Sequence, residues 1–272
     1  MRKFSQIFLI ALLLLGVLPS CSRPMQAVSP PDVPSTPAET EQPEESSPPE
    51  VSGEGDTLEP EEARIAAYRA ALEGLYFDHI LPDGYEMDRF GEERDITQNR
   101  FAVYDVDLDG QDELILEYTT TIVAGKIAWI YDFDSASNSL REQLCAYPIR
   151  LTFFDNGAVE EGWSHNQGHG GRFWPYTLYQ YDPETDTYRE VGSADAWDTE
   201  LFPERYPEGV EPDAGGFIYF LDMEYDMPVD GEAYTQWRNL YVGDAQILDV
   251  PYVNLTQENI AALEYTAERN QE

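Results

Sequence analysis

Residues 105–113 read Asp-Val-Asp-Leu-Asp-Gly-Gln-Asp-Glu, and they decide how the rest of the chain is interpreted. Taken as a loop, this stretch has acidic residues at its positions 1, 3, 5 and 9 and a glycine at position 6. Strand-like runs flank it, Phe-Ala-Val-Tyr at 101–104 and Leu-Ile-Leu at 114–116. The stretch therefore predicts a β-hairpin whose connecting loop binds a cation.

The spacing of the acidic side chains favours calcium. Carboxylates this close repel one another unless a hard divalent cation neutralises them, and Ca²⁺ takes about 6–8 oxygen ligands in irregular geometry. Mg²⁺ keeps more of its water and demands stricter geometry, so it suits the loop less well. The expected ligands are four side chains and the backbone carbonyl at position 7: Asp105, Asp107, Asp109, Glu113 and Gln111. The alternative is a solvated Asp-Gly hairpin turn without a cation.

The pattern D-x-D-x-D-G resembles the calcium loops of EF-hands, of dockerins and of the FG-GAP hairpins in integrin-like propellers. Leu116 stands at position 12, where an EF-hand has its bidentate Glu. The flanking residues alternate with period 2, as strands do. The FG-GAP hairpin is therefore the better analogue, although this chain is too short for a complete propeller.

The N-terminus predicts a lipoprotein. Residues 1–21 have the organisation of a signal peptide, with a basic end and a short apolar core at 7–17. Leu-Pro-Ser-Cys at 18–21 resembles the bacterial lipobox, which implies that Cys21 carries lipid and becomes the mature N-terminus. We therefore expect the protein to be anchored on the outer face of the bacterial cell membrane, with the remainder extracellular.

Composition divides the rest of the chain in two. Residues 22–58 contain eight prolines, six serines and eight acidic residues, so they predict a disordered tether rather than a folded unit. Residues 59–272 are expected to form a single globular domain. The net charge of −37 excludes a general nucleic-acid binder, which needs a basic surface.

The expected fold class is α+β, an antiparallel β-meander with an N-terminal and a C-terminal helix. Helical periodicity predicts helices at 59–77 and 257–270, the second with Thr256 as N-cap. A weak internal repeat of alternating runs predicts a meander over 101–192, arranged as one curved or layered sheet. Further strands are expected at 217–221, 234–242 and 245–253, Pro183–Asp186 reads as a plain turn, and Cys145 reads as a buried, inert thiol.

A second candidate site lies at 163–174, a glycine-rich stretch with two histidines between two tryptophans: Trp163, His165, His169 and Trp174. Histidines four residues apart suit a zinc site on a helix, but the glycines argue against a helix. The stretch reads as a connecting loop or, alternatively, as a ligand pocket.

Taken whole, the chain resembles the uncharacterised surface lipoproteins of Gram-positive bacteria, which implies a location and a metal but no activity. The leading interpretation is a non-catalytic binding or scaffolding module for an extracellular peptide, glycan or protein. The alternative is a secreted hydrolase that uses the His165 and His169 loop. The sequence contains no nucleophile elbow, P-loop or dinucleotide fingerprint.

Overall fold

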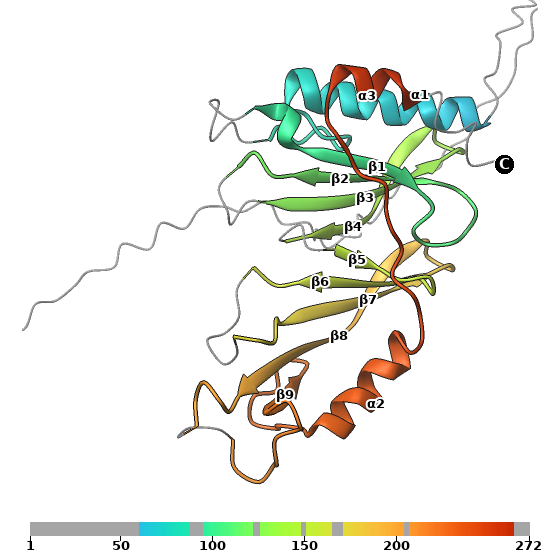
Figure 1. Cartoon of the computed structure of the whole chain (residues 1–272). Coiled ribbons are helices and arrows are strands. Elements are labelled where there is room, and N and C mark those ends of the chain that lie inside the picture. The colour runs from blue at the N-terminus through green and yellow to red at the C-terminus, as the bar shows by residue number, and fades with distance from the viewer. Residues whose placement is uncertain are drawn as a thin grey trace, which may run out of the picture. The chain divides into compact units, whose positions relative to one another are not determined.

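The computed structural model describes residues 60–87, 95–121, 126–147, 151–164, 171–203 and 207–263. These residues belong to one compact unit, which spans residues 57–272. The fold is α+β with antiparallel meander-type sheets, as the sequence predicts, and the described residues form two such sheets and three α-helices (Figure 1). The first sheet has the order β10-β1-β2-β3-β4 and the second has the order β5-β6-β7-β8-β9.

The strands of the first sheet are β1 (Arg100–Tyr104), β2 (Glu113–Tyr118), β3 (Ile127–Asp134), β4 (Ser139–Ala146) and β10 (Val253–Asn254). Those of the second sheet are β5 (Leu151–Phe153), β6 (Ala158–Gly162), β7 (Tyr176–Asp182), β8 (Thr187–Asp198) and β9 (Phe217–Leu221). The meander is thus divided into two sheets rather than continuing as one.

The two sheets repeat the same hairpin. Residues 131–142 (YDFDSASNSLRE) and 179–190 (YQYDPETDTYRE) form the β3–β4 and β7–β8 turns, and each turn holds one residue at positive φ, Asn138 or Asp186. Both hairpins also carry a β-bulge at the same place, which leaves Gln143 unpaired on β4 and Val191 unpaired on β8. The internal repeat expected from the sequence is therefore seen in the structure as two matching hairpins, one in each sheet.

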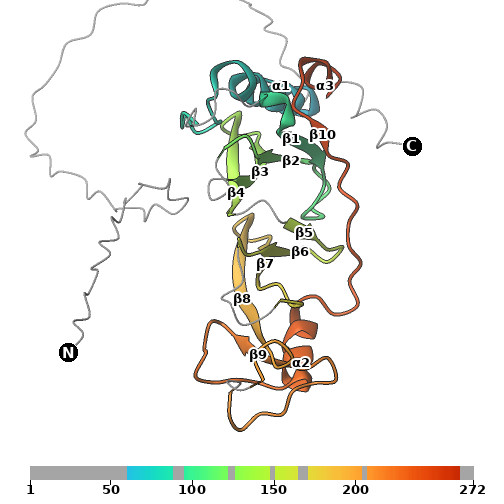
Figure 2. The same cartoon turned by 60° about the vertical axis from the view of Figure 1, so that its left-hand side comes forward.

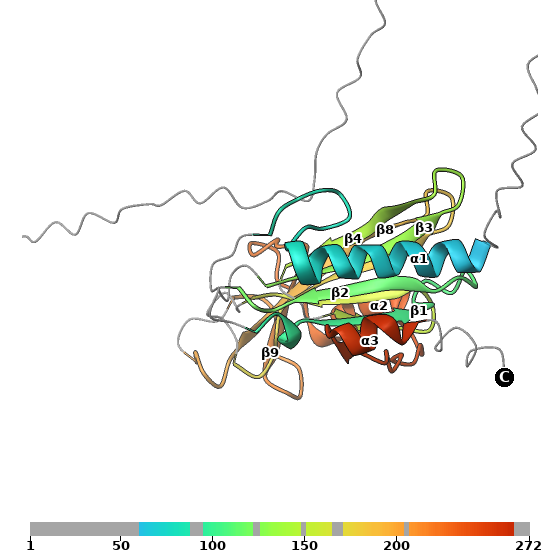
Figure 3. The same ribbon diagram turned by 90° about the horizontal axis from the view of Figure 1, so that it is seen from above.

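The described elements form four layers: helices α1 (Pro60–Glu73) and α3 (Gln257–Ala261), the first sheet, the second sheet, and helix α2 (Gly231–Tyr241) (Figure 2). A hydrophobic cluster fills the space between each pair of neighbouring layers. Helices α1 and α3 lie side by side over the outer face of the first sheet (Figure 3). The middle cluster joins the two sheets through apolar side chains from both, among them Ile115, Ile130, Leu144, Val159 and Tyr188. The third cluster joins the second sheet to α2.

Both terminal helices begin close to where their sequence signals place them. Helix α1 buries Ile65, Tyr68 and Leu72 on one face and continues into a short π-helix, Gly74–Asp78. Thr256 caps α3 by accepting a hydrogen bond from the Asn259 N–H. Beyond residue 263 the predicted helix lies outside the described residues.

The strand predicted at 234–242 is wrong, because these residues form α2. Asp230 caps the helix by accepting from the Ala233 N–H, and Tyr234, Trp237 and Tyr241 follow at helical spacing. The aromatic composition suggested a strand, but the spacing of three and four residues places these rings on the one face that covers the second sheet.

The strand predicted at 245–253 is also wrong in extent. This segment runs from α2 to α3 along both sheets (Figure 1), so it meets two separate strand edges. Ile247 forms an isolated bridge with Phe154, next to β5, and only residues 253–254 pair with β1 as β10. One regular strand cannot follow two edges that belong to different layers.

Cys145 does not match its expected state. It lies on β4, is half-buried, and is disulfide-bonded rather than a free buried thiol. None of the described helices combines the length and the apolar character that crossing a membrane requires.

Candidate metal centre

The acidic loop joins β1 to β2, where Tyr104 pairs with Glu113 and closes the hairpin. Inside the loop, backbone N–H groups donate to the acidic side chains. Asp105 accepts from Leu108 at 2.7 Å and from Gly110 at 3.2 Å, and Asp109 accepts from Gln111 at 2.7 Å. Gly110 has a φ of +95°, which a residue with a side chain rarely adopts. These contacts turn the backbone so that the alternate acidic residues gather.

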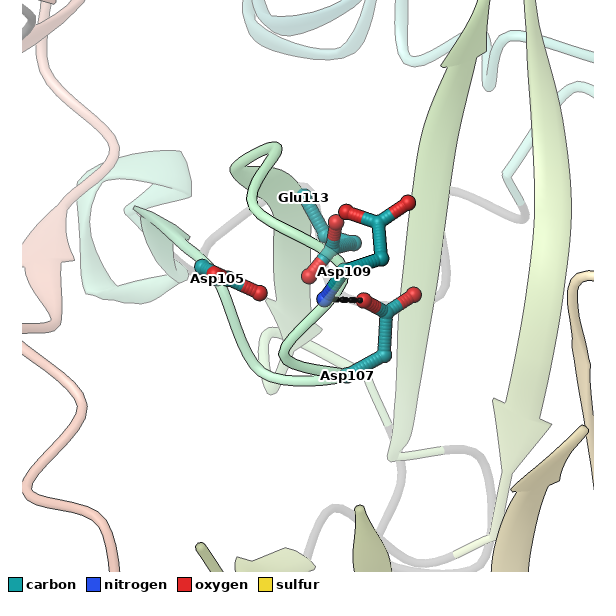
Figure 4. Close-up of side chains that lie close together, drawn as sticks. All are labelled: Asp105, Asp107, Asp109 and Glu113. Atoms are coloured by element: carbon teal, nitrogen blue, oxygen red, sulfur yellow. Dashed lines mark hydrogen bonds between the residues drawn. The ribbon is translucent and has the colours of Figure 1, made fainter. Parts of the chain in front are cut away.

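The structure brings together the four predicted acidic side chains. One carboxylate oxygen each from Asp105, Asp107, Asp109 and Glu113 lies within 4.8 Å of the others (Figure 4). The exposed fraction is 5% for Asp107 and 0% for Glu113. This cluster can hold a metal ion.

Within the cluster, Glu113 gives the strongest evidence for a bound cation. Its Oε2 accepts a hydrogen bond from the Val106 N–H at 2.8 Å, whereas its buried Oε1 has no hydrogen-bond partner. A buried polar atom without a partner costs about 1–3 kcal/mol, and more when the group is charged. A cation beside Oε1 removes this cost, so the donor set fits a hard metal ion.

The electrostatics agree with that fit. Burial, followed by the charge of Asp107, raises the pKa of Glu113 to about 10. Burial also raises the pKa of Asp107 to about 6, although its hydrogen bond from Gln143 acts in the opposite direction. Burial likewise raises the pKa of Asp105. Without a cation, a proton on Glu113 therefore partly neutralises the cluster at neutral pH, and a bound cation would take the place of that proton.

The second sheet also reaches the loop. Gln143 Nε2, on β4, donates to Asp107 Oδ2 and to Asp186 Oδ1, at 2.8 Å in both cases. The turn predicted at Pro183–Asp186 is confirmed as the β7–β8 turn, and Asp186 in it also reaches the loop through Gln143. Burial raises the pKa of Tyr188, on β8, and the charges of Asp107 and Glu113 raise it further. The sequence contains no signal for these contacts, because Gln143 lies 36 residues from Asp107 and 43 residues from Asp186.

Helix α1 fixes the other side of the loop. The Tyr68 hydroxyl donates to the Asp112 carbonyl at 2.7 Å, and the Arg64 guanidinium lies 3.8 Å from the Asp112 carboxylate. A cleft of about 710 Å³ opens between the first turns of α1 and the outer side of the loop, and Asp105 and Gln111 line it. The Gln111 carbonyl, expected as the fifth ligand, stays a prediction.

Of the second candidate site, His165 and His169 lie outside the described residues. The two tryptophans do come together, since the Trp174 indole N–H donates to the Trp163 carbonyl at 2.6 Å. The Trp163 indole in turn donates to Thr177 at 2.9 Å, and Trp174 is 41% exposed. These contacts join the two tryptophans that flank the stretch, and its use as a ligand pocket stays a prediction.

Comparison with protein-family models, with curated proteins and with solved structures finds no match to this chain.

Proposed function

We propose that this protein binds one calcium ion in the β1–β2 loop and uses it to stabilise an extracellular module. The observation that carries the proposal is Glu113, a fully buried carboxylate with one unpartnered oxygen in a cluster of four acidic residues. Asp105, Asp107, Asp109 and Glu113 would hold the ion. Calcium is favoured over magnesium because the ligands are all oxygens on an irregular loop, which Ca²⁺ tolerates better.

The module itself is proposed to be non-catalytic, a binding or scaffolding unit carried on a lipid anchor at the outer face of the cell membrane. The support comes from the sequence: a lipobox-like end at Cys21, then an acidic and proline-rich tether. The hydrolase alternative depends on His165 and His169, which lie outside the described residues, so it stays a prediction.

The calcium proposal predicts the melting behaviour of the protein. An ion that binds only the folded loop stabilises it by RT ln(1 + [L]/Kd), about 1.4 kcal/mol when the free ion is ~10 times Kd. For a domain of this size, that corresponds to a rise in Tm of roughly 3–6 °C. We expect millimolar CaCl₂ to raise the Tm, MgCl₂ to raise it less, and a chelator to reverse both effects in differential scanning fluorimetry. If neither calcium nor chelator changes the Tm, the loop is a solvated turn that binds no cation.

The anchoring proposal predicts how the protein partitions. We expect wild-type protein expressed in a bacterium to enter the detergent phase and Cys21→Ala to stay in the aqueous phase, with Cys145→Ser as the control that behaves like wild type. If wild type and Cys21→Ala partition into the same phase, Cys21 carries no lipid anchor.

A further inference from the structure

We propose that metal binding in the first sheet depends on the second sheet through Gln143, which acts as the positioning residue for Asp107. Gln143 and its two acceptors, Asp107 and Asp186, are called the Gln143 bridge below. This inference rests on the proposed function and deepens it, because it assigns control of the metal site to a turn in the other structural repeat.

The Gln143 bridge begins at the β-bulge on β4. Tyr131 pairs with Glu142 and Ile130 pairs with Leu144, so Gln143 is the extra residue of the bulge. A bulge lets two consecutive side chains face the same way. Leu144 packs in the cluster between the sheets, and Gln143, only 4% exposed, reaches the turn of the opposite sheet beside it.

The amide of Gln143 is suited to join two carboxylates. Its Nε2 carries two hydrogens, and one is given to Asp107 and one to Asp186. No carboxylate or apolar side chain can do this, since neither donates two hydrogen bonds at neutral pH. Without the amide, the buried carboxylate of Asp107 would lose its partner at Oδ2 and face another negative charge.

The far end of the Gln143 bridge is itself fixed. Asp186 accepts from the Tyr181 hydroxyl at 2.9 Å and pairs with Arg141, which also binds Asp132 at 3.0 Å. On the near side, Asp107 Oδ1 accepts from the Asp109 N–H at 3.1 Å (Figure 4). A continuous set of contacts therefore runs from the β7–β8 turn to a metal-ligand candidate, and thermodynamic linkage requires that the ion also strengthen this contact between the sheets.

The experiment measures the calcium Kd of the whole protein by isothermal titration calorimetry at 25 °C, pH 7.5, with CaCl₂ as the probe. Residues that orient a metal ligand typically change affinity by about 10–100-fold. We expect Gln143→Met to weaken binding by about that factor and Asp186→Ala by at least about fivefold. Asp186→Asn keeps an oxygen that accepts from Gln143, so we expect it to restore most of the affinity.

The matched control is Asn138→Ala. Asn138 occupies the same place in the β3–β4 turn and has the same φ of +52° as Asp186, so alanine is equally strained at both. We expect Asn138→Ala to bind calcium like wild type. We also expect Gln143→Met/Asp186→Ala to bind no more weakly than Gln143→Met alone, within about twofold, because both changes break one chain of contacts.

Wild-type affinity in Gln143→Met and Asp186→Ala would overturn this inference and leave the calcium site intact. Additive losses in the double variant, or an equal loss in Asn138→Ala, would also overturn it, since both indicate general destabilisation. Absence of calcium binding in wild type would overturn the proposed function and this inference together, so the two failures are distinguishable.

Discussion

Replacing Glu113 by glutamine is expected to stabilise the calcium-free protein and to abolish its response to calcium. The glutamine side chain keeps an oxygen for the Val106 N–H and fills the same volume, but it removes a carboxyl group whose pKa burial raises to about 10. At pH 8 the unfolded chain gains free energy by ionising Glu113, whereas the folded protein keeps it protonated. The variant escapes this cost, which is on the order of a few kcal/mol.

In a chelator at pH 8, Glu113→Gln should therefore melt about 5–10 °C above wild type. As calcium is added, the difference in Tm between the two proteins should become smaller, because only wild type has the Glu113 carboxylate that binds the ion. The matched control is Glu161→Gln, since Glu161 is also buried but has partners for both oxygens, the Tyr147 N–H and the Tyr179 hydroxyl. Its calcium response should equal that of wild type. A Glu113→Gln variant that melts below wild type in chelator would contradict the assigned role of this buried charge.

The calcium response of wild type is expected to grow with pH. The folded-state pKa values of Asp107, about 6, and Glu113, about 10, both lie above their ordinary values of 3.8 and 4.5. Without calcium, these two groups therefore bind more protons in the folded protein than in the unfolded chain, and their contribution to stability is greatest at low pH. That contribution falls as pH rises between about 4.5 and 10, by roughly 1.4 kcal/mol per pH unit for each proton concerned.

Calcium displaces these protons, so its apparent affinity should increase by up to about tenfold per pH unit and proton. The measurement is the difference in Tm between calcium and chelator at pH 5.5, 7.0 and 8.5. Taking the difference cancels the pH dependence of Tm that comes from buried carboxyl groups away from the loop. Glu161 is one of these, since burial also raises its pKa. A calcium effect that is constant or shrinks over this range would mean that the ion does not compete with protons at Glu113.

Much of the framework could be predicted because local patterns carry it. The apolar stripe of α1, the N-cap Thr256 and the continuous apolar run of β9 each act within a few residues. The acidic loop could be predicted for the same reason, since its spacing places the carboxylates on one loop wherever the hairpin packs. These elements agree with the structure in type and nearly in their limits.

What could not be predicted depends on contacts between distant residues. The aromatic residues of α2 suggested a strand, and the helix became evident only from its packing on the second sheet. The division of the meander into two layers depends on which face of each strand is covered. Gln143 meets Asp186 across the two sheets, 43 residues away in the sequence, and no local pattern marks that contact.

The central claim is that the β1–β2 loop binds calcium, and equilibrium binding tests it most directly. Calcium is titrated into chelator-treated wild type and Asp107→Ala by isothermal titration calorimetry at pH 7.5. The predicted result is saturable binding of one ion per chain in wild type, with a Kd of ~10⁻⁴–10⁻³ M, and no saturable binding in Asp107→Ala. No saturable heat in wild type up to about 10 mM calcium, well above that range, or equal binding by both proteins, would contradict the account.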